Sequence, residues 1–326
     1  MKLADQLHIN LDTIDKEMLR IVRTDMSLPM LSAIAGNIGR MISAGGKRLR
    51  PMMVMVGSRF GRMADPKKVL QMAAVTEFIH VASLIHDDVI DQADTRRGKP
   101  TLHVLTDVPT AIHTANYMMA RVAELLSKVE DDKNPYREEI TGLLTSRLCL
   151  GEYQQMANRF NFSLSMDTYL SKTRNKTAIL MSTCLEVGAR LGRATPEVTA
   201  KLAQFGDHLG MAFQIRDDVL DFTETSEALG KPAGSDLANG NITLPVMYAL
   251  QDERLSGSVR QLHEHSTEEE IHRVVQMIRD SDILDRADQM AEEYLQKAAN
   301  IVGELAEYPA HKDLEVLITY FGKRKT

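Results

Sequence analysis

Apolar residues recur along most of the chain at spacings of three and four, and no stretch alternates between apolar and polar residues for long. Prolines stand at the start of many apolar stretches, where the first turn of a helix tolerates them. The pattern therefore predicts an all-α fold. We expect helices near residues 4–23, 28–43, 50–60, 66–92, 109–130, 135–160, 166–191, 196–223, 243–252, 267–280, 283–305 and 310–322.

Composition excludes several classes of protein. The 326 residues include 39 Lys and Arg and 45 Asp and Glu, so the broad positive field of a nucleic-acid-binding protein is absent. No apolar run is long and uncharged enough for a transmembrane segment, and the N-terminus lacks the apolar core of a signal peptide. No linker-like segment divides the chain. We expect a single cytoplasmic domain over residues 1–326, with no nucleic-acid partner.

Two cysteines, Cys149 and Cys184, lie far apart in apolar helical sequence. In a reducing cytosol, such residues are typical of buried small hydrophobic side chains rather than of a disulfide. We therefore expect both to be buried thiols.

The sequence Asp-Asp-x-x-Asp occurs twice, each time near the end of an expected long helix. The two copies are Asp87, Asp88 and Asp91, and Asp217, Asp218 and Asp221. At 3.6 residues per turn, the first and last aspartates of each copy share one helix face, and the middle one lies about 100° round. Carboxylates near a helix C-terminus oppose the helix dipole, and aspartate is a poor helix former. Breaking a local rule twice in this way indicates a functional site.

Clustered carboxylates repel one another unless a cation lies between them. Oxygen ligands without Cys or His favour Mg²⁺, which usually keeps several waters and bridges to substrate phosphates. The aspartates therefore predict magnesium, and magnesium predicts a phosphate-bearing substrate. Two such helix faces set opposite each other would line a cavity with carboxylates.

Basic residues accompany both acidic motifs. A glycine-bearing turn, Gly45–Pro51, presents three cations at the start of an expected helix, where backbone N–H groups also attract anions. Arg96-Arg97-Gly98 follows the first acidic motif, and Gly230-Lys231-Pro232 follows the second. Acids and cations in this order predict two phosphate-bearing substrates, one held through Mg²⁺ and one bound directly by cations.

The chain resembles the trans-isoprenyl diphosphate synthases over residues from Gly45 to about Leu250. The family's motifs are matched in order by Gly45–Pro51, Asp87–Asp91, Arg96–Gly98, Lys176-Thr177, Phe213-Gln214, Asp217–Asp221 and Gly230–Leu237. This resemblance implies a single large all-helical bundle of the class I isoprenoid synthase type around a central cavity. It also implies condensation of isopentenyl diphosphate with an allylic diphosphate such as farnesyl diphosphate.

The resemblance also implies roles for individual residues. The metal set, which would hold three Mg²⁺ ions with diphosphate bound, is Asp87, Asp88, Asp91, Asp217, Asp218 and Asp221. The residues implied to bind the diphosphate of isopentenyl diphosphate are Lys47, Arg50, His80 and Arg97, and those on the allylic diphosphate are Arg96 and Lys231. The catalytic residues along the allylic substrate are Lys176, on its diphosphate, and Thr177 and Gln214, beside the developing cation.

Product length follows from the residues below Asp87 on its helix. Ala82 and Ser83 lie about one turn below it, with Phe78 and Ile79 a further turn away. Small side chains one turn below would leave the path of the growing chain open. We therefore expect a product longer than farnesyl diphosphate, in the hexaprenyl to heptaprenyl range, as a precursor of menaquinone side chains. The alternative is a shorter geranylgeranyl or farnesyl product.

The subunit arrangement is left open by the sequence. The stretches Thr110–Thr114 and Gly151–Phe160 resemble the large catalytic subunit of heterodimeric hexaprenyl or heptaprenyl diphosphate synthases. Ala115-Asn116 stands where homodimeric members usually have Gly-Asp, on a helix that forms the subunit contact in the family. Both a homodimer and a heterodimer with a small non-catalytic subunit are consistent with these residues.

Three other functions can be weighed against this one. A helical di-metal oxidase needs two inward Glu-x-x-His pairs, and that spacing occurs at Glu77-x-x-His80 and Glu269-x-x-His272, the latter in a charged, solvated turn. A terpene cyclase needs neither a second acidic motif nor a second diphosphate pocket. A non-catalytic prenyl-diphosphate-binding subunit would be expected to lose motif aspartates, and all six are present.

Overall fold

A computed structural model describes residues 2–25, 32–96, 98–127, 144–223 and 233–323. Within these ranges almost all regular structure is helical, and the only strands form one short hairpin. The all-α class predicted from the apolar spacing is confirmed.

The chain forms two compact units, each assembled from three stretches of sequence. Unit 1 contains residues 1–143, 183–203 and 308–316, and unit 2 contains residues 144–182, 204–307 and 317–326. Three helices contribute residues to both units: α10 (Ile179–Leu191), α11 (Pro196–Thr223) and α18 (His311–Gly322). The single domain expected over residues 1–326 stays a prediction.

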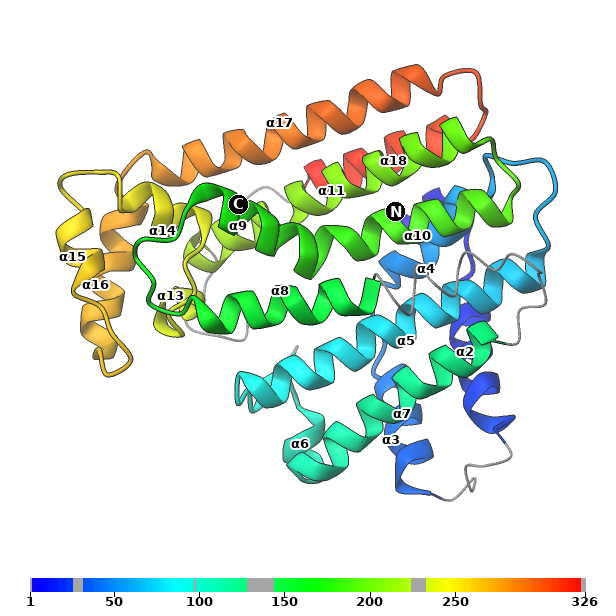
Figure 1. Cartoon of the computed structure of the whole chain (residues 1–326), viewed down its shortest axis with the longest axis horizontal. Coiled ribbons are helices and arrows are strands. Elements are labelled where there is room, and N and C mark those ends of the chain that lie inside the picture. Colours follow the sequence, from blue (N-terminus) through cyan, green and yellow to red (C-terminus); the bar gives the residue numbers. More distant parts are fainter. Residues whose placement is uncertain (1, 26–31, 97, 128–143, 224–232, 324–326) are drawn as a thin grey trace. The chain divides into compact units, whose positions relative to one another are not determined.

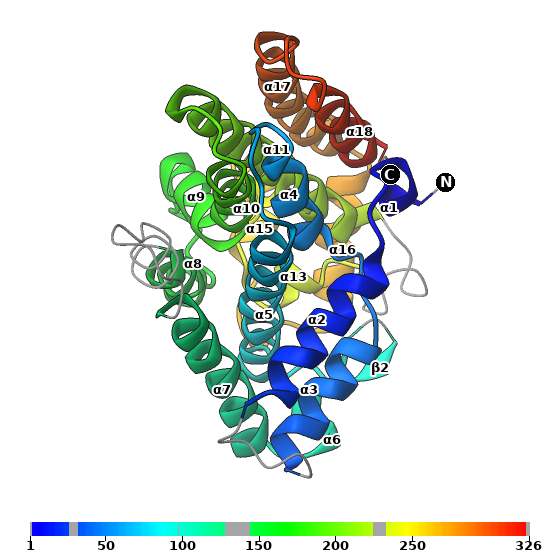
Figure 2. The same cartoon turned by 90° about the vertical axis from the view of Figure 1, so that its right-hand side faces the viewer.

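Unit 1 is organised around one long central helix, α5. Its further elements are α1 (Leu3–Gln6), α2 (Leu11–Arg23), α3 (Ala33–Ser43), α4 (Leu49–Ser58), α6 (Leu102–Leu105) and α7 (Val108–Ser127). Helix α5 (Pro66–Ile90) packs against α2, α4 and α7 (Figures 1 and 2). No run able to span a membrane was expected, and that expectation was wrong for this helix, which is long and apolar enough to do so. However, 67% of its most apolar window is buried inside the protein. Its hydrophobicity is therefore that of a core helix.

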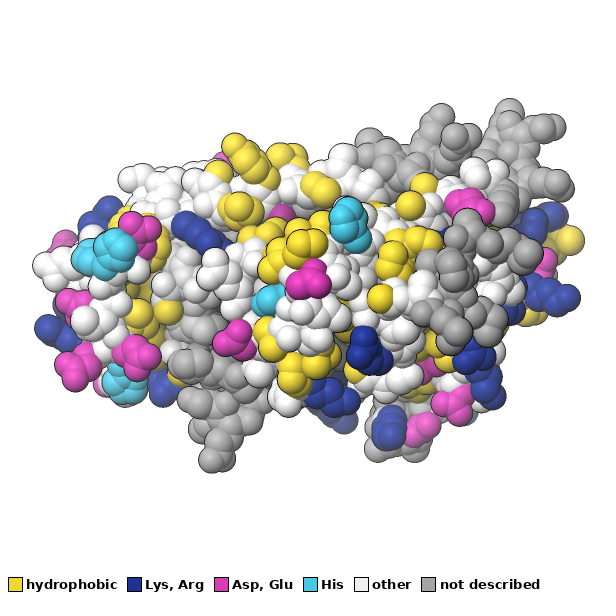
Figure 3. Space-filling view, turned by 90° about the horizontal axis from the view of Figure 1, so that it is seen from below, with side chains coloured by type: hydrophobic (Ala, Val, Ile, Leu, Met, Phe, Trp, Pro, Cys, Tyr) yellow, Lys and Arg dark blue, Asp and Glu magenta, His cyan; other side chains and the backbone are white. Residues whose placement is uncertain are grey.

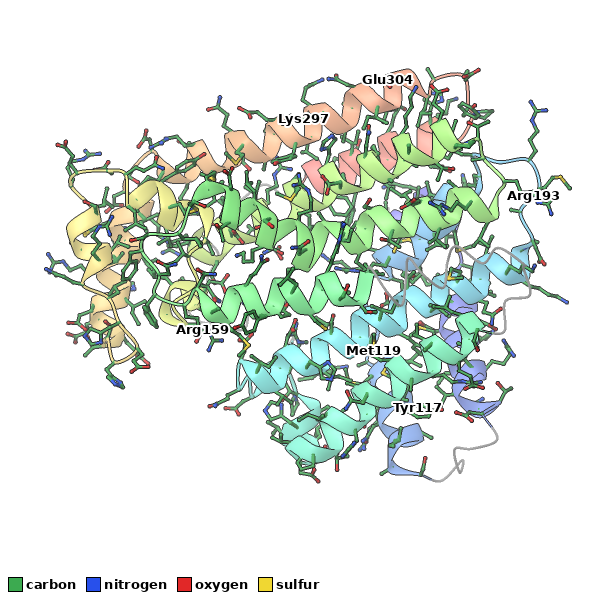
Figure 4. All side chains as sticks on the ribbon, in the orientation of Figure 1. Tyr117, Met119, Arg159, Arg193, Lys297 and Glu304 are labelled. Carbon is green, nitrogen blue, oxygen red and sulfur yellow. The ribbon has the colours of Figure 1, made fainter. Side chains whose placement is uncertain are left out.

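A polar contact also joins two outer helices of unit 1. The hydroxyl of Tyr117, which is labelled on α7 in Figure 4, donates a hydrogen bond to the carboxylate of Asp25, just after the end of α2. Burial and the Asp25 carboxylate raise the pKa of Tyr117, so its phenol stays protonated and can donate.

Unit 2 contains several short helices, the long helix α17 and one irregular turn. In chain order they are α8 (Thr145–Ala157), α9 (Met166–Thr173), the π turn η2 (Arg174–Ala178), α13 (Ser235–Ala238), α14 (Leu244–Ala249), α15 (Ser256–Arg260), α16 (Glu268–Arg279) and α17 (Ile283–Glu304). Helix α8 packs against both α9 and η2, and α17 packs against α14 and α16.

The structure departs from the expected elements in several places, and the short helices α6, α13 and α15 lie where no helix was expected. The helix expected over residues 4–23 is broken at His8, which has φ = 53°. The helix expected over 166–191 contains η2, where hydrogen bonds widen to the π pattern. A hairpin of β1 (Thr95–Arg96) and β2 (Lys99–Pro100) follows α5, with Gly98 at φ = 71° in its turn. Apolar periodicity carries no signal for such local changes in backbone geometry. Residues 28–31, 128–130 and 135–143 of the expected helices lie outside the described residues.

The prediction for the two cysteines is half right. Cys184 is buried, and burial raises the pKa of its thiol to about 12. Cys149 is exposed, so the prediction that both thiols are buried was wrong. It lies on α8 beside Leu150, and Leu150, Tyr153 and Met156 are large exposed hydrophobic residues of the same helix. The apolar sequence around Cys149 therefore reflects a surface rather than a core.

Candidate active site

The first acidic motif closes α5 in unit 1. Asp87 is half-buried, Asp91 is exposed, and the middle residue Asp88 is 3% exposed. Asp88 Oδ1 accepts a hydrogen bond from Arg96 Nε at 2.7 Å. Burial raises the pKa of the Asp88 carboxyl, and the positive charge of Arg96 offsets part of that rise. The middle aspartate, Asp88, thus binds Arg96 of the β1–β2 hairpin. The outer two, Asp87 and Asp91, lie one turn apart and closer to solvent.

The basic turn of unit 1 leads into α4. Lys47 is exposed and Arg50 is half-buried, whereas Arg48 between them is buried in a left-handed conformation with φ = 50°. His80, another residue implied to bind isopentenyl diphosphate, is half-buried on α5. Arg97 lies outside the described residues. Each described residue of this set lies in unit 1 and retains some exposure, as a diphosphate ligand requires.

The second acidic motif closes α11 in unit 2. Asp217 is half-buried, and Asp218 is 2% exposed. Asp218 accepts hydrogen bonds from the Tyr169 hydroxyl at 2.8 Å and from the Gln214 amide at 3.0 Å. Asp221 accepts from the Ser235 hydroxyl and the Asp236 backbone N–H, so it caps the start of α13. Lys231 lies outside the described residues. As in the first motif, the carboxylate of the middle aspartate is buried and accepts hydrogen bonds from other side chains of the protein.

The three residues predicted as catalytic come from η2 and α11. The Thr177 hydroxyl donates to Gln214 Oε1 at 2.7 Å, so these two belong to the same network as Asp218. Lys176 Nζ lies 2.8 Å from Glu152 Oε2 on α8, and both side chains are partly exposed. The structure thus brings Thr177 and Gln214 together and gives Lys176 an acidic partner that the sequence reasoning missed.

Two glycines allow helices α8 and α11 to pack closely against η2, which carries Lys176 and Thr177. A Cβ added to Gly151 of α8 would lie 2.7 Å from the backbone nitrogen of Lys176. A Cβ added to Gly210 of α11 would lie 2.5 Å from Ala178 Cα. Both distances are too short for a real side chain, so glycine is required for α8 and α11 to approach η2 this closely. The two glycines therefore place Lys176 and Thr177 against their partners.

The charge balance around Asp218 involves a buried lysine. Burial raises the pKa of the Asp218 carboxyl to about 6, and the positive charge of Lys172 lowers it in part. Lys172 Nζ lies 5.1 Å from the centroid of the Tyr169 ring, and burial lowers the pKa of its amine. Burial and the charge of Asp218 raise the pKa of the Tyr169 phenol, which therefore remains a donor. Tyr169 and Lys172 are residues that sequence reasoning missed, because each lies in an ordinary amphipathic helix.

The hydrogen bond from Tyr169 gives a first prediction. Tyr169→Phe removes the donor from a buried carboxylate, and we expect the free energy of unfolding to fall by about 2 kcal/mol. Chemical denaturation followed by circular dichroism would measure it. Tyr153→Phe is the matched control, because Tyr153 is 68% exposed on α8. Equal unfolding free energies for the two variants would contradict the role assigned to Tyr169.

The aspartates fit magnesium by their chemistry. Among the described residues, no three His, Cys, Asp or Glu side chains converge closely enough to hold an ion by themselves. Mg²⁺ suits such a set, since it is usually held by one or two carboxylates together with waters and substrate phosphates. Asp87 and Asp91 of unit 1 and Asp217 of unit 2 are the described motif aspartates that retain exposure.

The structure also bears on the di-metal oxidase alternative. Glu77 is buried, and its Oε1 accepts a hydrogen bond from Arg48 Nη1 at 3.0 Å. Glu269 and His272 are both exposed. A carboxylate paired with arginine and an exposed Glu-His pair do not supply the inward ligands that such a site needs. Neither pair supports that alternative.

Several patches of hydrophobic side chains reach the surface on the face shown in Figure 3. In unit 1 the large exposed hydrophobic residues are Met63, Ile90, Val104, Leu105 and Val108. Three of them gather within and just after α6, at the start of α7.

Comparisons with known proteins show the family of the chain. The polyprenyl synthetase family model matches residues 32–279. Heptaprenyl diphosphate synthase component 2 of Bacillus subtilis is 37% identical over 98% of this chain and 89% of its own length. The component 2 of Geobacillus stearothermophilus is 37% identical over 97% of this chain and 96% of its own. The structure of heptaprenyl diphosphate synthase from Staphylococcus aureus is 33% identical, with a TM-score of 0.88, over 99% of this chain and 98% of its own. The chain belongs to the polyprenyl synthetase family.

Proposed function

We propose that the chain is a trans-prenyltransferase that condenses isopentenyl diphosphate with an allylic diphosphate, building a medium or long polyprenyl diphosphate. The observation that carries this proposal is the near full-length similarity to two heptaprenyl diphosphate synthase components. The two acidic motifs and the basic turn supply the oxygen ligands and the cations that two diphosphate substrates require.

The reaction follows from the charges. The C1–O bond of the allylic substrate breaks, and its electron pair leaves with the diphosphate. The alkene of isopentenyl diphosphate then forms a carbon–carbon bond to the resulting carbocation, and a proton passes from the new unit to the released diphosphate. Thr177 and Gln214 present neutral dipoles, fixed by their mutual hydrogen bond, beside the developing cation. The mechanism requires no protein base.

Magnesium is part of this proposal. When bound, Mg²⁺ would supply positive charge against the charge that develops on the leaving diphosphate. Asp87 and Asp91 are the residues of unit 1 that would bind Mg²⁺, and Asp217 is the residue of unit 2 that would do so. We propose three ions in all once diphosphate is bound. Arg96 would add a fixed positive charge, oriented by its ion pair with Asp88.

The product that we propose is hexaprenyl or heptaprenyl diphosphate, for the side chain of a quinone such as menaquinone. The support is the small size of Ala82 and Ser83 together with the names of the similar synthases. We further propose that the protein works in the cytoplasm.

The name "component 2" of two relatives points to a partner subunit. We therefore favour a heterodimer with a small non-catalytic subunit over a homodimer. Ala115 is buried inside unit 1, whereas Asn116 beside it is exposed on α7 and is available to a partner.

The test is the product formed by the purified chain from labelled isopentenyl diphosphate and farnesyl diphosphate with Mg²⁺. We expect a ladder that ends at hexaprenyl or heptaprenyl diphosphate and that disappears when EDTA removes the metal. Pyrophosphate release should need both substrates, because release from an allylic diphosphate alone would indicate a cyclase. Binding of both substrates without turnover would show that catalysis awaits the partner subunit.

A further inference from the structure

The basic turn before α4 is held by a side chain that points away from solvent. Arg48 is the N-cap residue of α4, and its left-handed backbone conformation is unfavourable for a residue with a Cβ. Its side chain is only 3% exposed, whereas Lys47 beside it is exposed. A residue kept in a strained conformation with a buried charge is held there by specific contacts.

Those contacts come from three other helices. Arg48 Nε donates to Asp15 Oδ1 on α2 at 2.7 Å, and Nη2 donates to the carbonyl oxygen of Ile42, near the end of α3, at 2.8 Å. Nη1 donates to Glu77 Oε1 on α5 at 3.0 Å. The planar guanidinium can direct its donors to three elements at once, which a lysine ammonium on a flexible stem does less precisely.

The contact with α5 is the most buried of the three. Glu77 is 4% exposed, and its Oε2 has no hydrogen-bond partner among the described residues. Asp15, in contrast, has a partly exposed side chain. A buried ion pair is weak evidence for stability, because desolvation offsets much of the attraction, but it can fix one arrangement of the elements it joins. Glu77 thus ties the basic turn to α5.

Helix α5 also carries two other parts of the site. His80 lies one turn after Glu77, and Asp87 lies about 15 Å along the same helix at 1.5 Å per residue. The Arg48–Glu77 pair therefore links Lys47 and Arg50 on one element to His80 and the first acidic motif on another. All of these residues belong to unit 1.

We propose that Arg48 and Glu77 are positioning residues that set the basic turn at the correct distance and angle from α5 for isopentenyl diphosphate. This inference rests on the proposed function. It predicts that breaking the pair weakens the binding of isopentenyl diphosphate selectively. The pair positions the basic turn, whereas the first acidic motif, on which the allylic diphosphate depends, is part of α5 itself.

The experiment measures equilibrium dissociation constants by calorimetry for isopentenyl diphosphate, and for farnesyl diphosphate with Mg²⁺. Glu77→Gln keeps the shape of the side chain and removes its charge. We expect about a tenfold weaker affinity for isopentenyl diphosphate, with farnesyl diphosphate affinity changed by less than about twofold. Arg48→Lys should give the same pattern. In turnover, the KM for isopentenyl diphosphate should rise at unchanged kcat.

Asp15→Asn is the matched control, since it removes a carboxylate from the same guanidinium but leaves the link to α5. Its affinities for both substrates should stay within about twofold of the original chain. Two outcomes would overturn the positioning role and leave Arg48 as a fold-stabilising residue. One is an equal loss of isopentenyl diphosphate affinity in Asp15→Asn and Glu77→Gln. The other is an equal loss of affinity for both substrates in Glu77→Gln. If the unaltered chain bound neither substrate, the proposed function itself would fail.

Discussion

Asp87→Asn should lower the rate of chain elongation by about a thousandfold. The substitution removes a negative charge from a half-buried position on the last turn of α5, where the proposed Mg²⁺ would gain a carboxylate ligand. Metal ions contribute several kcal/mol to transition-state charge stabilisation, and each 1.4 kcal/mol corresponds to about tenfold in rate. Initial rates at saturating substrate over a range of Mg²⁺ concentrations would show a lower kcat and a higher requirement for Mg²⁺.

Asp88→Asn separates metal binding from a general effect of charge at this helix end. Asp88 is buried against Arg96, and an asparagine oxygen could still accept the arginine hydrogen bond. We therefore expect a loss of about tenfold, with the Mg²⁺ requirement unchanged. A thousandfold loss in Asp88→Asn would show that the middle aspartate is a metal ligand as well, as the resemblance first implied for all six.

Ala82→Tyr should shorten the product to farnesyl diphosphate when the primer is a shorter allylic diphosphate. The aromatic ring would close the path that the growing chain follows beside α5, one turn below Asp87. Thin-layer or liquid chromatography of the dephosphorylated products would measure this directly. An unchanged product distribution would refute the idea that residues below Asp87 limit growth.

The burial of Ala82 makes a second variant necessary. Ala82 has no exposed surface, so a tyrosine there must displace packed neighbours at some cost in stability. Ser83 is half-buried and offers a more tolerant position for the same ring. Ser83→Tyr should shorten the product in the same way, and Ala306→Tyr, at an exposed site just after α17, should leave the product unchanged.

The sequence predicted the long helices well because they rest on strong apolar periodicity. Helix α5 was expected over residues 66–92 and is found over Pro66–Ile90, and α11 begins and ends where its pattern does. The helical period accounts for the burial of the acidic motifs only in part. In the first motif the middle aspartate, about 100° from the outer pair, turns inward, whereas in the second motif both Asp218 and the outer Asp221 are buried.

The network that holds these residues in place was much less accessible to sequence reasoning. Nothing in the order of residues distinguishes Tyr169 or Lys172 from other positions of an amphipathic helix, because their partner Asp218 lies on a distant segment. Arg48 lies inside a recognised motif, yet its inward orientation depends on a left-handed backbone that only the tertiary contacts select. Local sequence patterns predict helices, whereas the pairs Tyr169–Asp218 and Arg48–Glu77 join residues far apart in the sequence.

The π turn η2 has a consequence for changes in chain length. Its wider turn accommodates one residue more than regular α-helical winding would. Deleting one residue between Arg174 and Ala178 would let that turn relax to ordinary winding. The preceding helix would then keep its orientation and Tyr169 would stay beside Asp218. An inserted residue would exceed what the widened turn takes up and would rotate the preceding helix by about 100°, carrying Tyr169 away from Asp218. Insertions in this short segment should therefore be far less tolerated than a single deletion.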